Sequence, residues 1–283
     1  MKPYWRLTTL ALLILFAAIV LPRPSAAQLD PWEFEVYPYQ TLGRGMIELE
    51  SLNGVVSKGH GSGDHGTSAG ALPSQSMWRT AFELTYGLTD RIETAAYVNL
   101  AKPSGHDLQY AGAKFRLRGS LFDQGQLPID LGWYIELESH RVPEFDDQKL
   151  ELELRPIIQK DFGSFSVMLN PIFEKVLDGP DRHKGFEFGY AAGIYYRWMR
   201  TLSPGFEFYG GVGNIRHPDP SKEQQHYIFP VIRGALSHGI EYNIGAGFGL
   251  TPGSDPVIVK FNLELEKFLG AIFGPSSGSG SFF

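Results

Sequence analysis

The stretch Met77–Leu100 constrains the fold more than any other part of the chain, because its side chains alternate strictly over two arms. A period of two indicates β-strands, and each arm is about ten residues long, the length of a tilted strand that crosses a bilayer. One face of the two arms carries Trp78, Thr80, Phe82, Leu84 and Tyr86, and then Ile92, Thr94, Ala96, Val98 and Leu100. The chain between the arms, Gly87–Asp90, predicts a short turn.

The same alternation recurs along the chain and predicts about twelve strands. Besides the two arms, we expect strands near residues 45–56, 107–118, 128–138, 148–159, 164–176, 185–198, 205–215, 226–236, 239–250 and 256–268. Long connections follow the odd-numbered strands and short ones mostly follow the even-numbered strands, with 119–127 as the exception. An even strand number and loops sorted by length are typical of bacterial outer-membrane barrels. The predicted fold is all-β, a single antiparallel transmembrane barrel.

Composition narrows the class further. A mean hydropathy of -0.15 is too polar for a bundle of membrane helices but suits a barrel, in which half of the strand residues face water. The formal net charge of -6 argues against nucleic acid as a partner. The chain has no cysteine, which excludes disulfides, thiolate metal sites and thiol catalysis.

The N-terminus has the pattern of a signal peptide. Lys2 and Arg6 precede an apolar run from Leu7 to Leu21, and Ser25-Ala26-Ala27 supplies small residues for cleavage. We therefore predict a signal peptide at 1–27, with an uncleaved anchor helix as the alternative. The mature chain then divides into a periplasmic lead-in or plug at 28–44, the barrel at 45–268 and a Gly/Ser-rich tail at 269–283. The predicted location is the outer membrane of a Gram-negative cell.

The turn sequence Tyr86-Gly-Leu-Thr-Asp-Arg-Ile-Glu93 resembles the repeated hairpin of the transporter family of the phenol meta-cleavage degradation pathway. Length, signal peptide and aromatic strands are also similar, whereas the hairpin is the one local match. The resemblance implies an outer-membrane barrel that carries aromatic or other hydrophobic compounds. One departure is the C-terminus, where 274–281 has no strand pattern, so we expect the barrel-assembly machinery to read Val259–Phe268 instead.

Charged residues on the polar strand faces must line the lumen, because basic side chains on the lipid face cost about 2–4 kcal/mol each at mid-depth. The predicted lumen-lining residues are Glu83, Glu93, Lys114, Arg116, Arg118, Glu136, Glu151, Glu153, Arg155, Glu187, Arg197, Glu207, Arg233, Glu241 and Lys260. They predict a water-filled path that selects solutes by charge. The alternative is a closed core of paired charges, as in small barrels.

Three cations on one strand predict a basic ladder. Lys114, Arg116 and Arg118 fall on the same inward row, and we expect Glu93 and Asp130 to neutralise only its periplasmic end. The facing wall is richer in glutamate, so the lumen would carry a transverse field that orients dipolar solutes. Ion pairing that closes the lumen is the competing interpretation.

Other chemistry is weakly supported. Seven of the eight histidines fall in or beside predicted outer loops, where His60, Asp64 and His65 form a weak candidate metal site. The pairs Ser62–His65 and Ser237–His238 have no third residue in register for a nucleophilic triad. We therefore predict no enzymatic activity, no cofactor and no bound metal. The expected partners are outer-membrane lipids, the barrel-assembly machinery and a small-molecule solute.

These observations favour a passive channel for small solutes. The alternative is a structural or surface-interaction barrel with a plugged lumen and no transport. Residues 28–44 and the long loop at 57–76 separate the two, because they would close the lumen if they folded inward.

Overall fold

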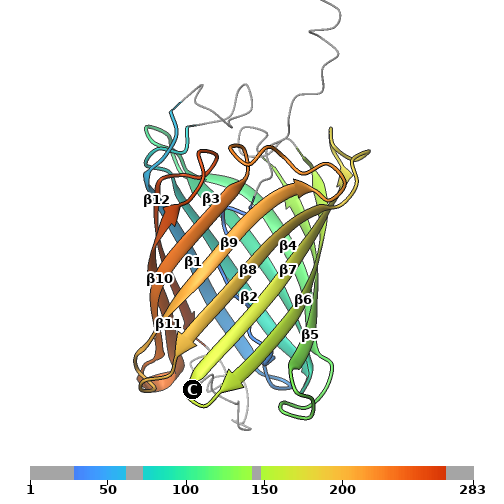
Figure 1. Cartoon of the computed structure of the whole chain (residues 1–283), viewed down its shortest axis with the longest axis vertical. Helices are drawn as coiled ribbons and strands as arrows, with labels where there is room; N and C mark the ends of the chain where they lie inside the picture. The colour runs from blue at the N-terminus through green and yellow to red at the C-terminus, as the bar shows by residue number, and fades with distance from the viewer. Residues whose placement is uncertain (1–28, 62–72, 142–147, 266–283) are drawn as a thin grey trace, which may run out of the picture.

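The computed structural model describes residues 29–61, 73–141 and 148–265. It confirms a closed antiparallel barrel of twelve strands, in which each strand pairs with its neighbours in sequence and β1 pairs with β12 (Figure 1). The strands are β1 Ile47–Lys58, β2 Trp78–Thr89, β3 Ile92–Lys102, β4 Gln109–Ser120, β5 Asp130–His140, β6 Leu150–Phe162, β7 Phe165–Asp178, β8 Glu187–Tyr196, β9 Ser203–Asn214, β10 Gln225–Ala235, β11 Ile240–Gly249 and β12 Val257–Leu265.

The opening hairpin differs from the expectation at its turn. β2 continues through Gly87 to Thr89, which leaves only Asp90 and Arg91 between β2 and β3, and the strand register shifts between Gly87 and Thr89. Gly87 is therefore not a turn glycine. A Cβ atom there would lie 2.0 Å from the carbonyl oxygen of Gly43, so a glycine is required because another part of the chain passes directly over it.

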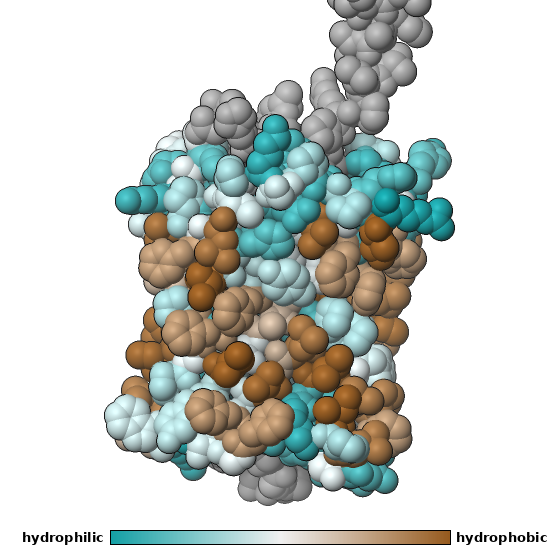
Figure 2. Space-filling view, in the orientation of Figure 1, coloured by the Kyte–Doolittle hydropathy of each residue, from teal (hydrophilic) through white to brown (hydrophobic). Residues whose placement is uncertain are grey.

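The two faces of the wall differ as the alternation predicts. Along β2, Phe82, Leu84 and Tyr86 are exposed on the outside, whereas the intervening Glu83 and Thr85 are buried within the barrel. Figure 2 shows a broad apolar belt on the visible face, with polar rims above and below it. This is the surface that a lipid bilayer requires, because lipid cannot solvate polar side chains.

The connections at the two ends of the barrel are of unequal length. The long ones, including the β1–β2 loop, gather at the upper end in Figure 1, and the tight β2–β3 and β6–β7 turns lie at the lower end. The β4–β5 connection is the long exception at the lower end. Within the described residues, no helix is long and apolar enough to cross a membrane. The predicted signal peptide and C-terminal tail lie outside the described residues.

Candidate functional site

The segment Leu29–Arg44, which precedes β1, lies inside the barrel; we call it the plug. It forms no strand, yet most of its side chains are buried, including Trp32, Phe34, Tyr37 and Tyr39. An extended chain crossing a lumen needs partners for its backbone groups, since it has no sheet of its own. The barrel wall supplies these partners from strands on several sides.

Polar side chains of the wall hold the plug backbone. The Tyr37 N–H donates to Asn170 Oδ1 of β7 at 2.7 Å, and Asn170 Nδ2 donates back to the Tyr37 carbonyl oxygen at 3.1 Å. The Tyr39 N–H donates to Gln159 Oε1 of β6 at 2.8 Å. Near the short-turn end, the Leu42 N–H donates to Glu93 Oε2 of β3 at 2.6 Å. These side chains take the place that a neighbouring strand would occupy.

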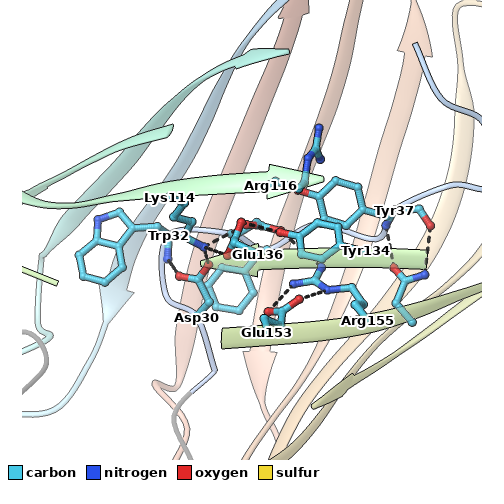
Figure 3. A network of polar contacts seen from close by, with 12 residues as sticks. Asp30, Trp32, Tyr37, Lys114, Arg116, Tyr134, Glu136, Glu153 and Arg155 are labelled. Carbon is cyan, nitrogen blue, oxygen red and sulfur yellow. Dashed lines mark hydrogen bonds and ion pairs between the residues drawn. The ribbon is translucent and has the colours of Figure 1, made fainter. Parts of the chain in front are cut away.

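Ion pairs fix one side of the plug, which we call the paired flank (Asp30 and Glu33 of the plug with Lys114 of β4 and Arg155 of β6). Lys114 Nζ contacts both Asp30 and Glu33, the latter at 3.1 Å, and Arg155 Nη1 lies 3.4 Å from Glu33 Oε1. Figure 3 shows Asp30, Lys114 and Arg155 of this flank, with the contact between Lys114 and Asp30. Burial raises the pKa of the Glu33 carboxyl, but the two cations outweigh this effect and lower the pKa to about 2. Glu33 is therefore ionised at neutral pH.

The Tyr37 ring lies among the cations of the wall. The guanidinium carbons of Arg116, Arg118 and Arg155 are each 5.0 Å from its centroid, a distance at which cation–π attraction operates. Its hydroxyl lies 3.0 Å from the hydroxyl of Tyr97 on β3. A single aromatic side chain thus covers charges that would otherwise face the lumen.

Aromatic contacts hold the plug on a different part of the wall. The Phe34 ring packs edge-on against Tyr209 and Tyr227, with centroids 5.3 and 5.6 Å apart. Lys260 of β12 is fully buried there, donates to the Phe34 carbonyl oxygen at 2.9 Å and pairs with Glu207 of β9. The plug backbone therefore shares this cation with the wall.

Carboxylates gather on the remaining side, which we call the acidic flank (Glu48 and Glu50 of β1, Glu83 of β2 and Glu264 of β12, facing Glu35 of the plug). The flank borders a cavity of about 80 Å³. Seven glutamates and three arginines line this cavity, so negative charge is in excess by four. Burial, together with Glu83 and Glu33, raises the pKa of Glu35 to about 7.

The predicted lumen residues fall into two groups. Most are buried, and ion pairs connect many of them to one another or to the plug. The buried ones are Glu83, Glu93, Lys114, Arg116, Arg118, Glu136, Glu153, Arg155, Glu207 and Lys260. The others, Glu151, Glu187, Arg197, Arg233 and Glu241, are partly exposed. Arg197 pairs with Asp161 at 2.9 Å, and His140 pairs with Glu151 at 2.9 Å.

The basic ladder is neutralised along its whole length rather than only at its base. Arg116 pairs with Glu83 at 2.6 Å and with Glu93 at 2.8 Å, and Lys114 pairs with the plug. Asp130, which we expected beside the ladder, instead accepts a hydrogen bond from the Gly125 N–H at 2.6 Å. The expectation did not include the plug carboxylates, which occupy the space between the ladder and the facing wall.

Sequence reasoning missed two sets of functional residues. Glu48 and Glu50 were not included among the lumen residues, although they alternate with Ile47 and Leu49 as the glutamates of β6 alternate with leucines. That alternation was a usable signal. The plug carboxylates Asp30 and Glu33 had none, because no local pattern shows which wall cation an extended segment will meet.

The structure adds little support for the candidate metal site or for the two serine–histidine pairs. Asp64 and His65 of the weak metal candidate, and Ser62, lie outside the described residues. His60 Nε2 lies 3.0 Å from the carbonyl oxygen of Ser254. Ser237–Gly239 form a single 3₁₀ turn between β10 and β11.

Comparison with known proteins places the fold. No family model and no curated protein sequence matches the chain. Among solved structures, the COG4313 outer membrane channel from Pseudomonas putida F1 is similar with a TM-score of 0.55 at 12% identity, over 82% of this chain and 99% of that one. The KdgM porin is similar with a TM-score of 0.51 at 8% identity, over 77% and 98%. At these identities the likeness establishes the barrel fold.

Proposed function

We propose that the chain is an outer-membrane channel for small solutes whose lumen the plug closes at rest. The observation that carries this proposal is that a segment outside the sheet occupies the lumen and is held to the wall there by hydrogen bonds and ion pairs. Small barrels close with the side chains of their own wall. Here the wall cations and amides on which the plug rests are polar groups that water or a solute can also satisfy.

The location follows from the same features. The apolar belt fits a bilayer, and the similar structures are described as an outer membrane channel and a porin. A signal peptide at 1–27 would deliver the chain to the periplasm. If cleavage occurs there, the new N-terminus lies next to the first described plug residues, inside the barrel, so that the plug has a free end.

For the solute, we propose small aromatic or otherwise hydrophobic compounds. The resemblance of Tyr86–Glu93 to the transporter family of the phenol meta-cleavage pathway supports this class. The contacts of Phe34 provide independent support, because this plug side chain sits among the rings of Tyr209, Tyr227 and Phe229. When the plug moves, these rings would be available to an aromatic solute.

Planar-bilayer conductance tests the proposal. The full-length chain is compared with a variant that lacks residues 29–44 but keeps residues 1–28, and heat-modified gel mobility checks that both fold. We expect a low or intermittent current from the full-length protein and a steady current from the deletion variant, which aromatic solutes should reduce by occupying the lumen.

A structural barrel without transport is the second candidate. The observation that favours it is the small free volume of three cavities beside the plug, which measure about 80, 30 and 20 Å³. If the folded deletion variant carries no current, the wall itself is closed. The channel proposal then fails and the structural role is favoured.

A further inference from the structure

The acidic flank arises from the register of four neighbouring strands. Glu241 of β11 pairs with Glu264 of β12, Glu264 with Glu50 of β1, and Glu50 with Glu83 of β2. Like charges directly opposite one another destabilise a sheet. The plug adds Glu35 to this row instead of a cation, so the row needs a bound cation or protons to offset its charge.

Arg116 does not supply that charge to the whole row. Its Nη2 atom lies 2.6 Å from Glu83 Oε1 and 2.8 Å from Glu93 Oε1, so it serves these two carboxylates. Among the described residues, Glu50 makes no hydrogen bond or ion pair, although its side chain borders the cavity and it is only 7% exposed. Buried, unpaired carboxylates cost several kcal/mol each unless a cation or a proton neutralises them.

Three oxygen atoms of the acidic flank are buried without a hydrogen-bond partner among the described residues. They are Oε2 of Glu35, Oε2 of Glu83 and Oε1 of Glu264. Glu83 is therefore satisfied on one side by Arg116 and unsatisfied on the other. Two of these oxygens and the carboxylate of Glu50 belong to three residues whose carboxylates lie close together, Glu35, Glu50 and Glu83.

The geometry of these residues suits a calcium ion. Glu35, Glu50 and Glu83 can each offer one carboxylate oxygen such that all three lie within 4.8 Å of one another. Ca²⁺ binds oxygens at about 2.3–2.6 Å, so two ligands on opposite sides of the ion are about 4.6–5.2 Å apart. Mg²⁺ needs about 2.0–2.1 Å and a strict octahedron. The adjoining cavity of about 80 Å³ has room for waters that complete the coordination.

We propose that Glu35, Glu50 and Glu83 form a calcium site inside the lumen, which joins the plug to β1 and β2. The ion would offset two of the four excess negative charges around the cavity. It would also tie the plug to the side of the wall on which the described plug residues form no ion pair. The site does not depend on transport, because a structural barrel would gain the same link.

Isothermal titration calorimetry on the full chain in detergent tests the site. Metal-free protein at pH 8, where Glu35 with a pKa of about 7 is ionised, is titrated with CaCl₂ and separately with MgCl₂. The variants are Glu50→Gln and Glu35→Gln, which keep the side-chain shape. Glu151→Gln is the matched control, since Glu151 is also a strand glutamate but contacts His140 and not the cluster.

We expect one Ca²⁺ per barrel, weaker binding of Mg²⁺, and affinity lowered about tenfold or more by either cluster variant. Glu151→Gln should leave the affinity unchanged. Equal binding by wild type and a folded cluster variant would place the ion elsewhere and overturn the proposal. Absence of binding to folded wild-type protein at millimolar Ca²⁺ would overturn it as well and would favour protonated glutamates. Using two cluster variants guards against one that fails to fold.

Discussion

The two flanks of the plug solve the same physical problem differently. On the paired flank, Glu33 meets Lys114 and Arg155, so each buried charge has an opposite charge within 3.4 Å. On the acidic flank, Glu35 meets Glu50 and Glu83, and carboxylate faces carboxylate. The comparison indicates that ion pairs anchor the plug on the paired flank. On the acidic flank its attachment depends on a bound cation or on protonated glutamates. We therefore expect that the plug can move while the barrel stays folded.

Breaking the paired flank should have the largest effect. Glu33→Gln leaves Arg155 and Lys114 with fewer counter-charges in a buried site, and removal of one member of such a group costs about 3–5 kcal/mol. We expect a lower unfolding free energy in denaturant titration and a higher bilayer current. Glu151→Gln, at a glutamate whose side chain is 22% exposed, should change stability by about 0–1 kcal/mol. Equal losses in both variants would show that the flank is not an anchor.

A pH titration should sharpen the difference between the flanks. The pKa of Glu35 is raised from 4.5 to about 7 by burial and by Glu83 and Glu33, while the cations Arg116 and Arg118 oppose the rise. Because the pKa of Glu35 is higher in the closed plug than in a solvated carboxyl, protonation of Glu35 stabilises the closed plug. This stabilisation is complete below about pH 4.5 and is lost as the pH rises through about 7. In the presence of a calcium chelator, current should therefore increase between these values. Glu35→Gln should remove the dependence, and an unchanged dependence would assign it to another group.

The place where Gly43 of the plug passes over Gly87 of β2 allows a steric test, for which we expect a smaller effect. A Cβ atom at Gly87 would lie 2.0 Å from the Gly43 carbonyl oxygen, so Gly87→Ala should cost about 1–3 kcal/mol by forcing the plug away from the wall. At Gly54 of β1 the nearest atom is 4.0 Å from such a Cβ, which makes Gly54→Ala the matched control. Thermal unfolding in detergent measures both. If the two substitutions are equally tolerated, the plug does not pass over Gly87.

The smallest effect is expected at the surface. Arg91 and Asp123 form an ion pair at 2.5 Å in the turns at the short-loop end, but their side chains are 50% and 73% exposed. Solvent-exposed pairs contribute about 0–1 kcal/mol. Arg91→Gln should therefore leave both stability and current close to the wild type. A loss comparable to that of Glu33→Gln would mean that the turns, and not the buried flanks, hold the closed state.

Much of the wall could be predicted because its information is local. The alternation of Phe82, Leu84 and Tyr86 with Glu83 and Thr85 depends only on the two-residue period of a strand and on which face meets lipid. The same rule extends to all twelve strands. The sequence prediction was wrong at Gly87. Glycine is a common turn residue, but Gly87 lies within β2, where a glycine is needed because Gly43 passes over it.

The sequence by itself determined the barrel and the residues that face inward, because alternation and strand length are properties of consecutive residues. Only the tertiary structure decided what those residues meet. Glu33 and Glu35 are two positions apart in the plug, yet one lies between Lys114 and Arg155 and the other among Glu50 and Glu83. An extended segment without a sheet takes its path from long-range contacts with several strands, and no local pattern encodes those contacts.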